Sequence, residues 1–327
     1  MSSGLEHGYR PGEIQKILND AQSILETDFT EVRALSSNLE VIGTAYRNPE
    51  PQDKTAARIS VVRLGCQEVP LTPPDQFTLS TEELLSNICS ASENVDLMLV
   101  SFMDPETFGQ GRSIVEEIPG RVECPVINLR DDIYAPQAAL SNLLGIQSRL
   151  GPLAGKRIAI SWGFGSVFPL PTVPHSMIAA ASQLGAKIRV VAPKDFGLLR
   201  RVIREAEESA PDDVSIEETD QFEGAFDDVD VIYALNWCRL SDFQHPERNT
   251  EYASEYRDWF FTTDNTPENG LFLTQAPAQT ELLASQKLLS SERNMTQDWL
   301  KRRVVTLAAS MAYLAPSLTN PPMRHLI

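Results

Sequence analysis

Residues 153–174 read LAGKRIAISWGFGSVFPLPTVP, and this stretch sets the expected fold class. Its first part, residues 157–162, is a short apolar run of the kind that forms a buried strand. The part that follows holds two glycines and three prolines, so it can continue neither a strand nor a helix. A helical pattern comes next at residues 174–184, and a second apolar run at residues 186–192. This order of elements predicts a parallel βαβ unit.

The same alternation of strand and helix patterns extends in both directions along the chain. Further strand patterns lie at residues 39–46, 96–102, 124–129, 230–235 and 271–274, and helical patterns at residues 11–26, 55–65, 81–92, 196–208 and 295–314. A length of 327 residues favours about two domains. We therefore expect an α/β protein with two doubly wound parallel-sheet domains, one in residues 1–150 and the other in residues 151–294.

The composition restricts the kind of ligand and the location. A formal charge of −17 disfavours nucleic acids and anionic membranes as partners. No apolar run approaches the roughly 20 residues of a membrane span, and the first residues lack the features of a secretory signal. Four scattered cysteines without paired spacing predict a cytoplasmic protein with reduced thiols and no metal site. No dinucleotide fingerprint or phosphate loop indicates a cofactor.

Several local phrases occur in a recognisable order. They are Asn48-Pro49, the RLG at residues 63–65, the CPVINL at residues 124–129, the LAGKRIAISW at residues 153–162 and the DVDVIYALNW at residues 228–237. In this order and spacing the chain resembles the aspartate/ornithine transcarbamylase family, most closely its N-acyl-ornithine branch. The Gly- and Pro-rich segment is similar to the loop that forms a knot in that branch.

The resemblance implies a different ligand for each of the two domains. The first domain would bind carbamoyl phosphate, and the second would bind an amino-acid-like small molecule as cosubstrate. A last helix, at residues 295–318, would pack back on the first domain. Members of the family are built on trimers with active sites at subunit interfaces, so the resemblance implies a homotrimer.

The expected carbamoyl-phosphate loop departs from the family pattern. Carbamoyl transfer needs dense positive charge and hydrogen-bond donors, because a phosphate must be held as it leaves. The family supplies them as Ser-x-Arg-Thr-Arg, and the corresponding positions here are Glu50, Pro51, Gln52, Asp53 and Lys54. A single cation remains. At an intermediate dielectric, a unit charge about 4 Å from another contributes on the order of 4 kcal/mol, so the two carboxylates can cancel Lys54.

Two interpretations of this loop stay open. In one, Asp53 is an N-cap for a solvated helix that begins at Thr55. In the other, the site is rebuilt to prefer a cation or a neutral polar group, with Glu50, Asp53 and Lys54 as catalytic candidates.

Other family motifs have also changed. Ser101 stands at the position of a phosphate-binding arginine, and the family's His-Pro-x-Gln is Ala-Pro-Gln-Ala at residues 135–138. Gln137 is thus one residue early, which rotates its side chain by about 100° on a helix. The His-Cys-Leu-Pro motif becomes Thr274-Gln275-Ala276-Pro277, and the two basic residues that follow in the N-acyl branch are Gln279 and Thr280.

Some residues offer compensation for the lost groups. We take Gln137 as a further catalytic candidate. The substrate-binding candidates are Gln52, Thr55, Arg58, Ser101, Arg130, Trp237, Arg239, Thr274 and Gln275. For the arginines the alternative is a surface or interdomain ion pair of little energetic weight.

Three functions are compatible with this sequence. The first is an atypical ornithine-type carbamoyltransferase. The second is a repurposed enzyme that acts on an amino-acid-like substrate, and the third is a noncatalytic protein that binds a metabolite or a partner. We favour the second, because polar residues rather than apolar ones replace the family's site residues at Glu50, Gln52, Asp53, Thr274, Gln275 and Gln279.

Overall fold

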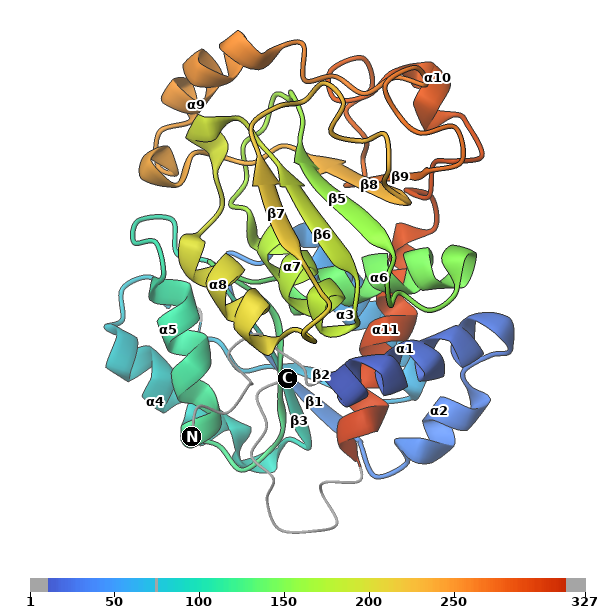
Figure 1. The fold of residues 1–327 in the computed structure, drawn as a ribbon. Helices are drawn as coiled ribbons and strands as arrows, with labels where there is room; N and C mark the ends of the chain where they lie inside the picture. The colour runs from blue at the N-terminus through green and yellow to red at the C-terminus, as the bar shows by residue number, and fades with distance from the viewer. Residues whose placement is uncertain (1–10, 74–75, 316–327) are drawn as a thin grey trace. The chain divides into compact units, whose positions relative to one another are not determined.

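Two sheets, each made of parallel strands, form the framework of the protein (Figure 1). The computed structural model describes residues 11–73 and 76–315. The chain divides into two units, the first comprising Met1–Leu144 and Leu300–Ile327 and the second Gly145–Trp299. The expected α/β fold with two parallel-sheet domains is therefore confirmed.

The sheet of the first unit has four strands. They are β1 (Val41–Arg47), β2 (Gln67–Pro70), β3 (Leu97–Phe102) and β4 (Val126–Asp131), and they pair in parallel in the order β2-β1-β3-β4. The chain thus moves outward from β1 in both directions, which places the topological switch point between β1 and β3. Open α/β sheets bind ligands beyond the carboxyl ends of their strands at such a point.

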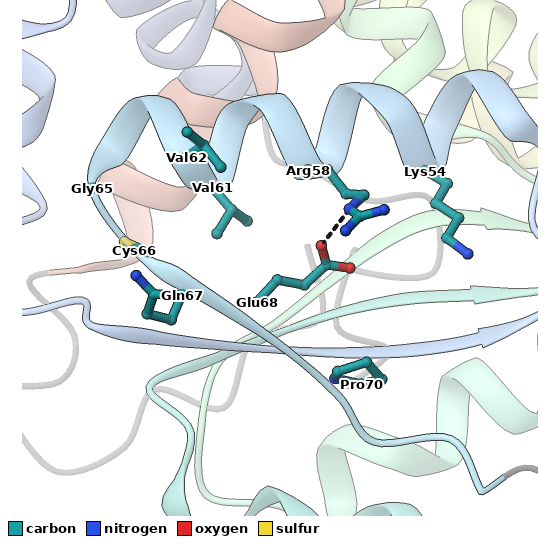
Figure 2. Close-up of a pocket in the computed structure, with 9 residues that line it drawn as sticks. All are labelled: Lys54, Arg58, Val61, Val62, Gly65, Cys66, Gln67, Glu68 and Pro70. Atoms are coloured by element: carbon teal, nitrogen blue, oxygen red, sulfur yellow. Dashed lines mark ion pairs between the residues drawn. The ribbon is translucent and has the colours of Figure 1, made fainter.

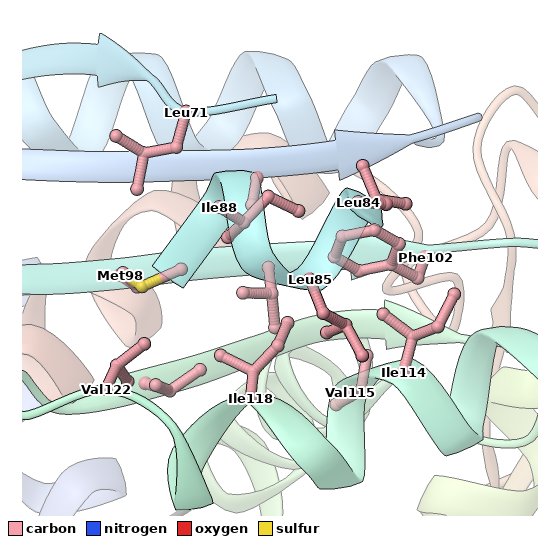
Figure 3. Close-up of a cluster of buried hydrophobic side chains, with 13 residues drawn as sticks. Leu71, Leu84, Leu85, Ile88, Met98, Phe102, Ile114, Val115, Ile118 and Val122 are labelled. Atoms are coloured by element: carbon pink, nitrogen blue, oxygen red, sulfur yellow. The ribbon is translucent and has the colours of Figure 1, made fainter. Parts of the chain in front are cut away.

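Helices cover both faces of this sheet. They are α1 (Pro11–Glu26), α2 (Thr30–Leu35), α3 (Pro51–Leu64), α4 (Thr81–Ala91), α5 (Gln110–Glu117), α6 (Pro136–Leu150), which continues into the second unit, and α11 (Trp299–Leu314). A buried apolar cluster joins α4 and α5 to one face of the sheet, with Leu85, Ile114 and Phe102 among its members (Figure 3). On α3, the Ser60 Oγ donates a hydrogen bond to the Val304 carbonyl of α11 over 3.0 Å.

The second unit has five parallel strands. They are β5 (Arg157–Trp162), β6 (Lys187–Val191), β7 (Ile216–Thr219), β8 (Val231–Leu235) and β9 (Leu271–Thr274), in the order β7-β6-β5-β8-β9. Its helices are α7 (Thr172–Gln183), α8 (Arg200–Ser209), α9 (Pro246–Ala253) and α10 (Gln286–Leu289). The switch point lies between β5 and β8. The Gly- and Pro-rich segment leaves the carboxyl end of β5 at this point.

Two expected boundaries are wrong in an informative way. Helix α3 begins at Pro51 rather than at Thr55, because proline is well accommodated in the first turn of a helix. Helix α11 begins at Trp299 rather than at residue 295. Residues 316–318 of the expected last helix lie outside the described residues, as does the amino-terminal segment that was compared with a secretory signal. In the described part of the chain, no helix is long and apolar enough to span a membrane.

Candidate functional site

The carboxyl ends of β1 and β3 are tied together at the switch point of the first unit. Asn48 follows β1 with a positive φ of 49°, and its Nδ2 donates to the Met103 carbonyl over 3.0 Å. Glu50 then occupies the N-cap position of α3, where its carbonyl accepts from the Asp53 and Lys54 amides. Its side chain makes no capping hydrogen bond. Glu50 thus contributes its backbone to the helix and presents a half-buried carboxylate.

Asp53 forms a buried ion triad with two arginines. Its side chain is buried in the first turn of α3. Its Oδ2 accepts from Arg130 Nε of β4 over 2.6 Å, and its Oδ1 accepts from Arg303 Nη1 of α11 over 2.6 Å. Each carboxylate oxygen is therefore bound by one guanidinium group. The expectation of a solvated cap is wrong, because a helix that starts at Pro51 turns its third residue inward.

The same triad corrects the view of Arg130 as a weak surface ion pair. Arg130 and Asp53 are both buried, so water does not screen their interaction. Charge-assisted hydrogen bonds of this length are about twice as strong as neutral ones. The Asp53 carboxylate consequently occupies the position at the amino end of α3 where two buried cations meet.

Two buried hydroxyl groups lie on strands that pair near this triad. Ser101 of β3 is in register with Tyr46 of β1 and with Arg130 of β4. Within the described residues, neither Ser101 Oγ nor Tyr46 Oη has a hydrogen-bond partner. Burial, followed by the charges of Glu68 and Asp53, raises the pKa of Tyr46 well above its usual value. These hydroxyls are neutral polar groups at the sheet end where ligands of such folds bind.

Lys54 and Arg58 line a groove between α3 and β2 (Figure 2). Successive helical residues are about 100° apart, so Lys54 cannot share the direction of Asp53. Arg58 Nε lies 3.1 Å from Glu68 Oε2. Thr55 Oγ1 donates to the Pro51 carbonyl within the helix, and Gln52 is half-buried.

At the switch point of the second unit, Gln279 holds the Gly- and Pro-rich segment. Its Oε1 accepts from the Ser166 amide over 2.7 Å, and its Nε2 donates to Asn236 Oδ1 over 3.0 Å. Asn236 in turn donates from Nδ2 to the Val167 carbonyl. A Cβ on Gly165 would lie 2.6 Å from Asn236 Nδ2, so glycine is required there. The Gln279 amide therefore fixes the Gly- and Pro-rich segment through hydrogen bonds.

Trp237 and Arg239 follow β8. Trp237 is buried, and its Nε1 donates to the Phe196 carbonyl over 2.7 Å. Arg239 stacks on Tyr252 with its guanidinium carbon 3.5 Å from the ring centroid, and its Nη1 lies 3.3 Å from Asp242 Oδ2. Trp237 is thus a packing residue, whereas Arg239 is a partly exposed cation beyond the end of a strand.

Thr274 and Gln275 lie at the carboxyl end of β9. Thr274 is buried, and its amide donates to Thr296 Oγ1 over 3.1 Å. Gln275 is half-buried and precedes the cis Ala276-Pro277 peptide bond. Among the described residues, no group of three His, Cys, Asp or Glu side chains is arranged to hold a metal ion.

Comparisons with known proteins show what this chain is similar to. Residues 171–314 match the Asp/Orn-binding domain of aspartate/ornithine carbamoyltransferases. The ornithine carbamoyltransferase of Halalkalibacterium halodurans is 24% identical over 250 residues, which cover 76% of this chain and 74% of the relative. The ornithine carbamoyltransferase of Anoxybacillus flavithermus is 25% identical over 242 residues, which cover 74% of this chain and 72% of the relative. Residues 171–314 thus resemble the Asp/Orn-binding domain of that family, and most of the chain is similar to ornithine carbamoyltransferases. A crystal structure of acetylornithine transcarbamylase complexed with acetylcitrulline shares the fold, with a TM-score of 0.82, 20% identity, and coverage of 94% of this chain and 97% of that one.

Gln137 differs from the carbamoyl-orienting glutamine that the family motif implies. It lies on α6, is buried, and donates from Nε2 to Ser310 Oγ of α11 over 3.3 Å. In this chain the residue thus connects α6 with α11. The one-residue shift of the motif is accompanied by this different direction of the side chain.

Sequence reasoning missed Arg303 and the aspartates after β4. Arg303 is separated from Asp53 by 250 residues, and the available signal was a pair of arginines, Arg302 and Arg303, in an otherwise apolar helix. Asp131 is the last residue of the fully buried strand β4, and Asp132 follows it directly. Asp131 Oδ2 accepts from Arg112 Nη1 over 3.2 Å.

Asp132 fixes the segment between β3 and α5. Its Oδ1 accepts from the Asp104 amide over 2.8 Å, and its Oδ2 from the Gly111 amide over 2.6 Å. Burial is the largest cause that raises the pKa of Asp132 to about 6, with a smaller contribution from Asp131 and Asp104, although the two amides lower it.

Asp132→Asn is expected to alter the pH dependence of stability. Because the pKa of Asp132 in the folded protein lies above its usual 3.8, folding favours the protonated carboxyl, and the stability contributed by this group falls as the pH rises from about 4 to about 6. The full change is on the order of 3 kcal/mol. Urea unfolding across this range should show the wild type losing stability relative to Asp132→Asn. A pH-independent difference would contradict this assignment.

Proposed function

We propose that this protein is a repurposed carbamoyltransferase-family enzyme of amino-acid metabolism that acts on an amino-acid-like small molecule without the family's carbamoyl-phosphate site. It works as a cytoplasmic homotrimer, with the Gly- and Pro-rich segment knotted as in the N-acyl-ornithine branch. The family resemblance and the acetylornithine transcarbamylase fold support the substrate class.

The buried triad is the observation that carries this proposal. A phosphate at the head of α3 would need free donors and positive charge. Asp53 already accepts from Arg130 and Arg303 there, and adds a negative charge of its own. The loss of one preorganised donor typically lowers a rate about a hundred- to a thousandfold, so standard carbamoyl transfer is not expected.

Carbamoyl phosphate is expected not to bind with appreciable affinity. Isothermal titration of the full chain with carbamoyl phosphate, next to an ornithine carbamoyltransferase as positive control, measures this directly. We expect no saturable heat at ligand concentrations that saturate the control enzyme. Saturable binding at micromolar concentrations would contradict the proposal and favour an atypical ornithine-type carbamoyltransferase.

A noncatalytic metabolite-binding protein is the second candidate, and one observation favours it. The Gln279 amide, at a position that is basic in the N-acyl branch, is engaged by Ser166 and Asn236 rather than held ready for a substrate. Amino acids and their N-acyl derivatives can be screened by thermal stabilisation and then assayed for turnover by mass spectrometry. Stabilisation with chemical conversion supports the enzyme, and stabilisation without conversion supports the binding protein.

A further inference from the structure

A groove between α3 and β2 is lined by residues that take no part in the ion triad. Its volume is about 530 Å³, within the roughly 300–1,000 Å³ typical of small-molecule sites. Lys54, Arg58 and Val62, spaced four residues apart, line it from α3, and Glu68 and Pro70 line it from β2 (Figure 2). Residues four apart share one face of a helix, so this wall is a continuous stripe.

The edge of β2 is poorly suited to an added strand. The Gln67 and Leu71 amides both donate toward β1, to the Glu40 and Thr44 carbonyls over 2.8 Å. Backbone groups alternate along the strand, so those of Glu68 and Pro70 face the outer edge, away from β1. Pro70 has no N–H group to donate there, and prolines protect edges in this way. An occupant of the groove is therefore held by side chains rather than by strand pairing.

The charges of the groove are mixed. In the described part of the chain, the Lys54 ammonium has no ion pair or hydrogen bond, whereas Arg58 pairs with Glu68 over 3.1 Å. The Arg58 side chain is 67% exposed and that of Glu68 is 18% exposed. Two cations beside one carboxylate form a locally positive site in a chain with a formal charge of −17. A ligand with only negative charge would be repelled by Glu68, and a ligand with only positive charge would be repelled by Lys54 and Arg58.

A zwitterion matches this arrangement. Its carboxylate pairs with Lys54 and Arg58, while its ammonium pairs with Glu68. Val62 is 71% exposed, and together with Pro70 it offers an apolar surface for a side chain. We propose that this groove binds a free α-amino acid with an apolar side chain, through side chains that lie outside the ion triad.

The experiment titrates the full-length protein with L-leucine and two analogues by isothermal calorimetry. N-acetyl-L-leucine lacks the ammonium, and L-leucinamide lacks the carboxylate. We expect L-leucine to bind at least about tenfold more tightly than either analogue, because each loses one charge-assisted contact. Equal binding of N-acetyl-L-leucine would overturn the role of Glu68, and no binding of L-leucine would overturn the site.

Variants locate the binding. Lys54→Met and Glu68→Gln should each weaken L-leucine at least about tenfold. Lys301→Met is the matched control, because Lys301 is another exposed lysine on a helix of the first unit, outside the groove, and it should leave the affinity unchanged. Circular dichroism verifies that each variant is folded. Unchanged affinity in both groove variants would overturn the proposal. The carbamoyl-phosphate titration of the unaltered protein tests the proposed function separately.

Discussion

Asp53→Asn is expected to lower the free energy of unfolding by about 3–5 kcal/mol. The substitution keeps the size of the side chain but removes the charge that compensates Arg130 and Arg303. Two buried guanidinium groups then lose the carboxylate that each of them contacts, which costs more than the lost attraction alone because their desolvation is less well offset. Urea denaturation monitored by circular dichroism measures the change.

Asp20→Asn is the matched control for this prediction. Asp20 pairs with Lys16 over 2.9 Å on the exposed side of α1, where an ion pair contributes about 0–1 kcal/mol. We expect the control to remain within that range. If Asp53→Asn were no more harmful than Asp20→Asn, the buried triad would not be a stabilising feature. A double-mutant cycle with Arg303→Met then isolates the coupling between the two side chains.

Gly111→Ala is expected to destabilise the first unit by about 3 kcal/mol or more. A Cβ at this position would lie 2.1 Å from the Phe102 carbonyl oxygen and 2.8 Å from Asp132 Oδ2. The backbone of β3 is paired on both sides and cannot withdraw, so α5 must shift and lose the hydrogen bond to Asp132.

Gly120→Ala is the control for the packing effect, because a Cβ there meets no atom within 4 Å. We expect it to change the stability by less than about 1 kcal/mol. Thermal unfolding of both variants, followed by calorimetry, distinguishes the two outcomes. A stable Gly111→Ala variant would show that α5 is free to move away from β3.

The sequence predicted the fold because strongly apolar strands such as β3 and β5 alternate with helical patterns. The edge strands β2 and β7 were not predicted, since their residues, QEVP and IEET, are short and partly exposed. Edge strands need not be apolar, because they contact fewer neighbours. The fold class thus depended on the buried strands, including the edge strands β4 and β9, which carry the clearest pattern.

The sequence identified the altered loop but not what Asp53 does. Whether its carboxylate faces water or the interior depends on the first residue of α3, and helix boundaries are poorly determined by local patterns. Its partner Arg303 is 250 residues away, so no local spacing could associate the two. The orientation of Gln137 likewise depends on contact with Ser310 of α11.

The ion triad also constrains the order in which this loop can change during evolution. Restoring an uncharged hydroxyl at position 53 removes the carboxylate that both Arg130 and Arg303 contact. Such an intermediate sequence would be poorly folded unless a soluble anion were abundant enough to take the place of the carboxylate. A stepwise return to a phosphate-binding loop therefore requires an intermediate sequence of low stability. The presence of Asp53 makes this reversal difficult.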